Sequence, residues 1–163
     1  MKVITIDDIN LDSLELYHTN KNHYNSKIYY KNNIFTTIFN KPLELYNMFI
    51  SNEEYISYFC PALICLIIEG NKLKGYQMKE GRIVRQLGCI NYIEKNKKKL
   101  IEFMEKSGYF YSDWKKKNLI KVNNQISLID LDSFHKIKKG ENKYWGLAID
   151  WYIKKVDEVA KTL

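Results

Sequence analysis

Short apolar runs alternate with polar turns in the first half of the chain. β-Branched and aromatic residues fill 26–30 and 34–39, and the Lys31-Asn32-Asn33 segment between them is typical of a hairpin turn. Two more apolar runs, 62–69 and 73–78, flank a short turn that contains glycine. Runs of this length, joined by tight turns, predict a small antiparallel sheet.

One helix is expected between these two hairpins. Pro42 suits the first turn of a helix, and from Leu43 the apolar residues recur at helical spacing over 43–59. Pro61 then ends the periodic stretch. The first half therefore predicts one antiparallel sheet with one helix.

The second half begins with a different pattern. Residues 88–107 have an apolar face and a lysine-rich polar face, and Gly108 supplies a helix stop. A last helix is expected over 142–161, where tryptophan and aliphatic residues recur at helical spacing. We therefore divide the chain into 1–80, with strands and one helix, and 81–163, with more helix.

Polar side chains should gather at the open end of a second hairpin. Segments 118–122 and 126–131 are apolar, and the two asparagines between them predict a tight turn. Because the open ends of a hairpin lie side by side, Asn118 and Asp130 should be neighbours, with Asp113 one loop away. An amide oxygen beside a carboxylate suits Mg²⁺. Asp113 is placed to orient an attacking hydroxyl group.

A lysine completes this set. Lys115 follows two residues after Asp113 and is placed to neutralise charge on a transferred phosphoryl group. The plainer interpretation is that 113–118 is a lysine-rich surface loop whose spacing is accidental.

These residues resemble the catalytic loop and the metal-binding loop of the protein kinase superfamily. That family carries His-Arg-Asp-Leu-Lys-x-x-Asn, then a short hairpin, then Asp-Phe-Gly. Asp113, Lys115, Asn118 and Asp130 match the Asp, Lys, Asn and second Asp in order and spacing. The resemblance implies that Asp113 and Lys115 are catalytic, that Asn118 and Asp130 hold Mg²⁺, and that ATP donates the phosphoryl group.

The likeness covers most of the chain in the expected order. The matching segments are 26–31 and 34–40 (second and third strands), the helix around Glu53-Glu54 (αC), 75–81 (hinge), 88–107 (αE) and 144–156 (αF). The resemblance implies an α+β, bilobal, protein-kinase-like fold. Its N-lobe, 1–80, would be a small antiparallel sheet with one helix, and its C-lobe, 81–163, would be truncated and mainly helical.

Departures from the family affect the nucleotide site first. No glycine lies in 19–26, where the family has a glycine-rich loop, and Thr37 stands where the family has its third-strand lysine. Lys27 is our first choice for a replacement lysine, with solvation of this side chain as the plainer alternative. Met78 and Glu80, on the hinge-like segment, complete the expected nucleotide contacts.

The metal loop and the segment after it also differ. Tyr111 and Ser112 replace the His and Arg of the catalytic loop, and Leu131-Asp132 replaces Phe-Gly. Asp132 is either a second metal ligand or a hydrogen-bonding turn residue. Few residues separate Asp132 from the last predicted helix, so we expect almost no activation segment. Little sequence follows that helix, so we also expect the usual peptide-docking helices to be missing. Such reduced folds resemble viral proteins or bacterial effectors, which implies action in the cytoplasm, that of a host cell included.

Charge and composition narrow the function classes. The 163-residue chain has a net charge of +7, with 18 basic and 10 acidic residues in 81–163 against 8 and 9 in 1–80. The second half should attract phosphates or acidic surfaces, although solvated lysines are the plainer interpretation. Three cysteines without a CxxC pair argue against a zinc site or disulfides. No apolar run approaches the ~18 residues of a membrane span, and we expect no signal peptide.

Three functions stay open from the residues. The first is a minimal, atypical protein kinase that transfers the γ-phosphate of ATP to a Ser or Thr hydroxyl with Mg²⁺. The second is a catalytically inactive pseudokinase that binds a partner protein. The third is a nucleic-acid-binding module that uses the lysines of 95–99, 115–117 and 136–139, against which the scarcity of arginine argues. The oligomeric state stays open in all three.

Overall fold

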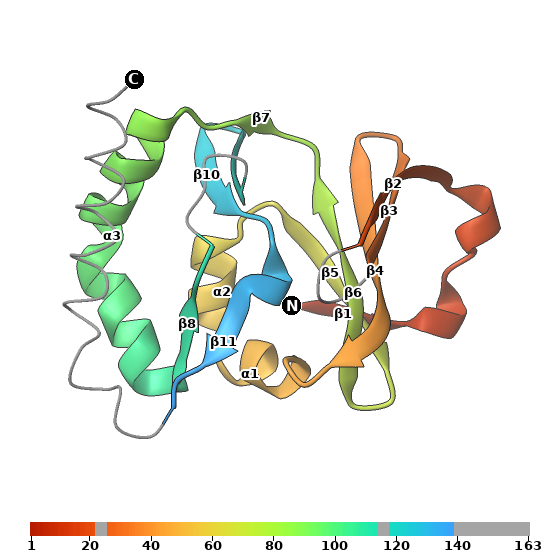
Figure 1. The fold of residues 1–163 in the computed structure, drawn as a ribbon, viewed down its shortest axis with the longest axis horizontal. Helices are drawn as coiled ribbons and strands as arrows, with labels where there is room; N and C mark the ends of the chain where they lie inside the picture. The colour runs from red at the N-terminus through yellow and green to blue at the C-terminus, as the bar shows by residue number, and fades with distance from the viewer. Residues whose placement is uncertain (22–25, 114–117, 139–163) are drawn as a thin grey trace. The chain divides into compact units, whose positions relative to one another are not determined.

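The computed structural model describes residues 1–21, 26–113 and 118–138, and this part of the chain is an α+β protein (Figure 1). The chain divides into two compact units between Gly81 and Arg82. Each unit contains both helix and strand, and each is described separately below.

A six-stranded sheet forms the centre of the first unit. Its spatial order is β1-β5-β6-β4-β3-β2. In chain order the strands are β1 (Lys2–Thr5), β2 (Glu15–Asn20), β3 (Ser26–Lys31), β4 (Ile34–Leu43), β5 (Leu63–Glu69) and β6 (Lys72–Lys79). Two 3-10 turns, Ile6–Asp8 and Leu11–Ser13, lie between β1 and β2.

The prediction of a purely antiparallel sheet is wrong at one edge. β1 runs parallel to β5, with Lys2 opposite Cys65, so the sheet is mixed. Every other neighbouring pair is antiparallel. The sequence pattern missed β1 because four residues show no clear period and because a parallel partner is not announced by a tight turn.

The predicted single helix over 43–59 is two short helices. They are α1 (Tyr46–Ser51) and α2 (Glu53–Phe59), and β4 continues through Pro42 to Leu43. The break lies at Asn52, whose side-chain amide and backbone N–H both donate to the carbonyl oxygen of Met48, at 2.8 and 3.1 Å. A short polar side chain that bonds back to the preceding turn competes with helix continuation.

Asparagine pairs form the tight turns of two of the three predicted hairpins. Asn32 and Asn33 have φ values of 52° and 63° and connect β3 to β4. Asn123 and Asn124 have φ values of 48° and 65° and connect the second predicted hairpin. Asparagine tolerates this left-handed backbone better than most residues do, and two-residue hairpin turns require it. Both hairpin predictions are confirmed.

The strands of the first unit approach each other closely at Gly75. A Cβ atom at this position would lie 2.0 Å from the carbonyl oxygen of Thr37 on the neighbouring strand β4. Glycine therefore permits the pairing of β4 with β6. The core beside this contact contains the fully buried side chains Phe39, Phe49, Ile56, Phe59, Leu66, Ile67 and Leu73.

The second unit contains one long helix and small sheets. The helix α3 (Gln86–Ser107) ends at Gly108, whose φ is 72°, which confirms the predicted helix and its stop (Figure 1). The strands are β7 (Arg82–Ile83), β8 (Tyr109–Tyr111), β9 (Leu119–Val122), β10 (Gln125–Leu128) and β11 (Phe134–Lys136). A three-stranded sheet has the order β10-β9-β7, and β11 pairs with β8.

The prediction of a mainly helical second half is not met by the part that the structure describes. Up to residue 138, that part has one α-helix and five short strands, of which sequence analysis found only the β9–β10 hairpin. Strands of two or three residues, such as β7 and β8, are too short to show alternation. The predicted helix over 142–161 lies outside the described residues.

Candidate functional site

The loop after β8 is tied to the turn after β10. β8 pairs with β11, with Tyr111 opposite Phe134. Ser112 donates from its N–H and from its Oγ to the carbonyl oxygen of Ser133, at 2.9 and 3.1 Å. Asp113 follows directly, so these bonds fix the start of its loop beside the turn that holds Asp130.

Asn118 links the far end of this loop to the hairpin. Its side-chain amide donates to the carbonyl oxygen of Asp113 at 2.9 Å, and its own carbonyl accepts from the N–H of Ile129 at 3.1 Å. Only 4% of Asn118 is exposed, so few water molecules can replace these bonds. The structure thus brings Asn118 against Asp113 and beside the residue that precedes Asp130.

Asp130 and Asp132 lie in one tight turn. Asp130 precedes the 3-10 turn Leu131–Ser133, and its carbonyl oxygen accepts from the N–H of Ser133 at 2.9 Å. The Ser133 hydroxyl donates to Oδ2 of Asp130 at 3.4 Å, a long bond. The carboxyl groups of Asp130 and Asp132 also hydrogen-bond to each other. Sequence analysis left Asp132 open between ligand and turn residue, and it has a turn position here.

This environment disfavours the charged form of Asp130. Burial is the first cause, followed by the hydrogen bond and negative charge of Asp132 and the more distant charge of Asp113. Together they raise the pKa of Asp130 to about 8. Asp130 therefore keeps its proton more readily than an ordinary aspartate does.

The donor set of this corner fits a hard divalent cation. Asp130 and Asp132 supply carboxylate oxygens, and Asn118 can add an amide oxygen. A cation there would displace the proton of Asp130, because it favours the charged carboxylate. Across the described ranges, no three His, Cys, Asp or Glu side chains form a complete metal-binding group. Mg²⁺ sites in proteins often use only one or two carboxylates, with water and phosphate oxygens as the other ligands.

Lys115, the second predicted catalytic residue, lies in 114–117, outside the described residues. Tyr111, at the position of the family's His, is buried, and its ring packs edge-on against Phe134 with ring centroids 5.1 Å apart. This aromatic pair therefore holds the end of β8, which precedes Asp113, against β11.

The predicted nucleotide contacts lie in the first unit. Lys27 is exposed on β3, opposite Ile38 of β4. Met78 is only 3% exposed, in β6 between Phe35 and Leu63. The Met78 side chain thus belongs to the core, whereas Lys27 is one of several exposed lysines of this sheet, with Lys31 and Lys79.

Glu80, the third of these residues, is held by the turn between β3 and β4. Its N–H donates to the carbonyl oxygen of Asn33 at 2.8 Å. The Tyr30 hydroxyl lies 3.0 Å from both Oε2 of Glu80 and Oδ1 of Asn33, and donates between them. The bond to Glu80 raises the pKa of Tyr30. Glu80 therefore has a fixed position at the end of the sheet.

Sequence analysis missed an aromatic cluster beside Glu80. Tyr30 and Phe35 lie opposite each other on β3 and β4, with ring centroids 4.8 Å apart. Tyr17, 66% exposed on β2, packs edge-on against Phe35 at 5.3 Å. The signal was present in the hairpin register, because a two-residue turn at 32–33 places Tyr30 across from Phe35.

The two glutamates of α2, the helix that resembles αC, lie in different environments. Glu53 forms an ion pair with the terminal ammonium group of Met1. Glu54 is exposed. Neither residue was predicted to bind a ligand, and the ion pair fixes the start of α2 near β1.

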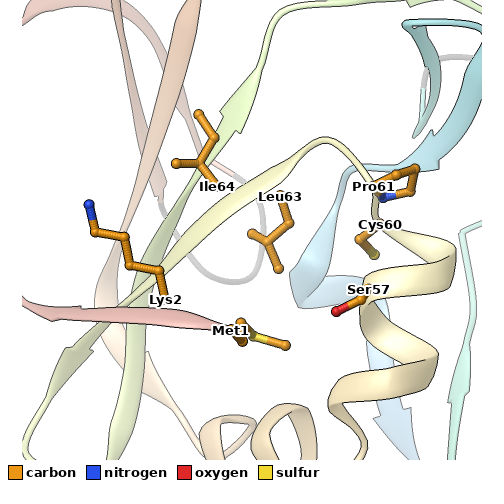
Figure 2. A pocket seen from close by; sticks show the side chains of 7 residues that line it. All are labelled: Met1, Lys2, Ser57, Cys60, Pro61, Leu63 and Ile64. Atoms are coloured by element: carbon orange, nitrogen blue, oxygen red, sulfur yellow. The ribbon is translucent and has the colours of Figure 1, made fainter.

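The first unit also contains a small cavity of about 140 Å³, separate from the predicted site residues. Figure 2 shows the side chains that line it, which come from β1, α2, β5 and the residues next to these elements: Met1, Lys2, Ser57, Cys60, Pro61, Leu63 and Ile64. Burial raises the pKa of the Cys60 thiol, so this sulfur stays protonated and unreactive. The cavity lacks the convergent polar groups of a catalytic site.

Comparison with protein-family models gives no match, and comparison with curated proteins gives no matching relative. Within the described part of the chain, none of the helices is both long enough and apolar enough to cross a membrane. The functional argument therefore depends on the geometry described above.

Proposed function

We propose that the protein is a minimal, atypical phosphotransferase of the protein kinase type, acting on a Ser or Thr hydroxyl. The observation that carries this proposal is the corner formed by Asp113, Asn118, Asp130 and Asp132. Asn118 bonds to the backbone of Asp113, and two carboxyl groups sit within one turn of each other. A base, a metal corner and their connecting amide are the parts that phosphoryl transfer needs.

Each residue then has a distinct role. Asp113 accepts the proton of the attacking hydroxyl, whose oxygen forms a bond to the γ-phosphorus of ATP while the bond to the β,γ-bridging oxygen breaks. ADP leaves with the electron pair of that bond. Asn118 and Asp130 would hold Mg²⁺, which neutralises charge on the phosphates, and Lys115 would contact the γ-phosphate. Positioning and charge stabilisation supply most of the rate.

The succession of elements supports the same proposal. The segments that resemble the second and third strands, αC, the hinge strand and αE are β3, β4, α2, β6 and α3 in the structure. The hairpin β9–β10 stands between Asn118 and Asp130, where the family has its own short hairpin. Two compact units divide near the hinge-like segment. The bilobal kinase-like fold and a cytoplasmic location are parts of the proposal.

Binding of Mg-ATP is the first test. We expect ATP with Mg²⁺ to raise the melting temperature by a few degrees, since ~1 kcal/mol of ligand stabilisation shifts Tm by about 2–4 °C in a chain of this size. Asp130→Asn should abolish the shift. Asp12→Asn, which changes an exposed carboxylate in the first unit, is the matched control and should keep it. Equal shifts in both variants would contradict a metal site at Asp130.

Transfer is tested separately from binding. Asp113→Ala should bind Mg-ATP as the wild type does, and should lose about 100-fold or more of phosphate transfer. Transfer is measured with γ-labelled ATP, as label incorporated into the protein's own hydroxyls or released to water. Wild-type rates in the Asp113→Ala variant would exclude Asp113 as the base.

A pseudokinase that binds a partner protein is the second candidate. It is favoured by Thr37, which is buried on β4 at the position where the family has its phosphate-binding lysine. It predicts no Mg-dependent shift of the melting temperature in any variant at millimolar ATP.

Nucleic-acid binding has less support, because the exposed lysines of α3 alternate with glutamates, as in Glu94 and Lys98 or Glu102 and Lys106. Such pairs, four residues apart, are typical of a solvated helix face.

A further inference from the structure

Both arginines of the chain lie within one short stretch of the second unit. The sequence has 26 Lys and Arg residues, of which only Arg82 and Arg85 are arginine, and both are exposed. Arginine binds carboxylates with two parallel hydrogen bonds, which lysine cannot do. The only bidentate cations of this chain are therefore concentrated around the two-residue strand β7.

Two cationic side chains occupy opposite positions on β7 and the neighbouring strand β9. Arg82 lies directly opposite Lys121 of β9, and Lys121 is also exposed. Like charges opposite each other on neighbouring strands destabilise a sheet. In the described part of the chain, no acidic side chain forms an ion pair with Arg82, Arg85 or Lys121. An acidic group brought to this edge would relieve the repulsion.

The outer edge of β7 has a pair of backbone groups that bond to no other described residue. β7 is the terminal strand of the β10-β9-β7 sheet (Figure 1). The N–H of Val84 donates to the carbonyl oxygen of Leu119 at 3.0 Å, and Ile83 is opposite Ile120. Because hydrogen-bonded and non-bonded pairs alternate in an antiparallel ladder, the N–H and C=O of Ile83 point away from β9. They are available to another strand.

Apolar side chains accompany this edge. Ile83 is 65% exposed and Leu87, in the first turn of α3, is 67% exposed, so two large aliphatic side chains lie largely in solvent beside β7. Charged residues on an edge strand normally deter pairing with another chain. Arg82, Arg85 and Lys121 are all positive, so they favour acidic segments over basic ones at this edge.

We propose that β7 and the start of α3 bind an extended acidic segment of a partner protein, which adds as a strand beside β7. Successive side chains of a strand point to opposite faces, so the segment should alternate acidic and apolar residues. Its acidic side chains would meet Arg82 and Lys121 on one face, and its apolar ones would meet Ile83 on the other. This surface is independent of phosphate transfer.

The test uses a short fluorescein-labelled peptide in which aspartate or glutamate alternates with valine, and the full-length protein without ATP. Fluorescence anisotropy should show saturable binding that weakens at least tenfold in the Arg82→Glu/Arg85→Glu variant. Lys95→Glu/Lys98→Glu, on the exposed face of α3, makes the same charge change and should weaken binding less than threefold. Circular dichroism checks that both variants are folded.

A second peptide tests the proposal without any change to the protein. N-methylation of its backbone removes strand hydrogen bonds while leaving charge unchanged, and it should also weaken binding at least tenfold. Equal loss in both charge-reversal variants, equal binding of the N-methylated peptide, or no binding at ~1 mM peptide would each overturn the proposal. Because no nucleotide is present, failure here leaves the Mg-ATP result untouched, and failure of Mg-ATP binding leaves this one untouched.

Discussion

At the scale of single residues, the burial of Asp130 opposes the ionisation of its own carboxyl group. Its carboxyl group is largely removed from water and lies beside the carboxyl group of Asp132. A buried carboxyl group of this kind is costly to ionise unless a cation arrives. The buried carboxyl group that lowers stability at neutral pH would therefore also favour the binding of a cation.

The raised pKa of Asp130 predicts how stability depends on pH. The folded state holds this proton up to about pH 8, whereas the unfolded chain releases it near the ordinary value of 3.8. The folded state thus binds more protons between these limits, and the free energy of unfolding should fall as pH rises from about 4 to about 8, by at most about 1.4 kcal/mol per pH unit.

Urea denaturation across this range measures the effect. Asp130→Asn removes the titrating group, so its stability should change less with pH, and it should exceed the wild type by at least about 1 kcal/mol at pH 8. Comparing the two proteins cancels the contribution of the histidines. Parallel pH profiles would show that Asp130 is ionised at its ordinary pKa.

At the scale of elements, the pairing of β4 with β6 depends on glycine, which has no side chain, at position 75. The space at Gly75 is closed by the backbone oxygen of Thr37, which cannot rotate away as a side chain could. Gly75→Ala should therefore destabilise the protein by about 2–3 kcal/mol. Gly70→Ala is the matched control, because it has a positive φ of 62° but no atom within 4 Å, and should cost about 1 kcal/mol. Chemical denaturation that ranked the two variants in the opposite order would contradict the close approach.

Elements specified by neighbouring residues could be predicted from the sequence, and those that depend on distant pairing could not. The asparagine pairs at 32–33 and 123–124 fix both hairpins locally, and Gly108 fixes the end of α3. The parallel pairing of β1 depends on contacts with a distant strand. The break at Asn52 depends on a side-chain bond that helical periodicity does not reveal.

The candidate site also has a part that the sequence predicted and a part that it did not. The approach of Asn118 to the residues near Asp130 follows from hairpin geometry, so the sequence predicted it. The bond between Asp130 and Asp132 and the burial of Asp130 depend on how the turn packs, and no spacing rule contains that information. The role of Ser112 and Ser133 as anchors required the pairing of β8 with β11, which sequence analysis did not find.

At the scale of the whole molecule, charge is distributed unevenly. The net charge of +7 comes from the second half, where 18 basic residues stand against 10 acidic ones. Much of the exposed lysine on α3 is offset by glutamate four residues away, whereas the cations around β7 have no such partners among the described residues. The molecule thus combines a diffuse positive field with one concentrated cationic edge.

This distribution predicts weak, salt-sensitive binding to nucleic acid. A labelled oligouridylate should bind at ~50 mM salt through diffuse attraction and lose about 100-fold or more of its affinity by ~200 mM, because no stacking or base contact holds it. The aromatic cluster provides a direct check, since Tyr17 is its most exposed ring. Tyr17→Ala should leave the anisotropy titration unchanged at both salt concentrations. Affinity that survived ~200 mM salt and fell at least tenfold on Tyr17→Ala would instead identify base stacking and favour the nucleic-acid-binding function.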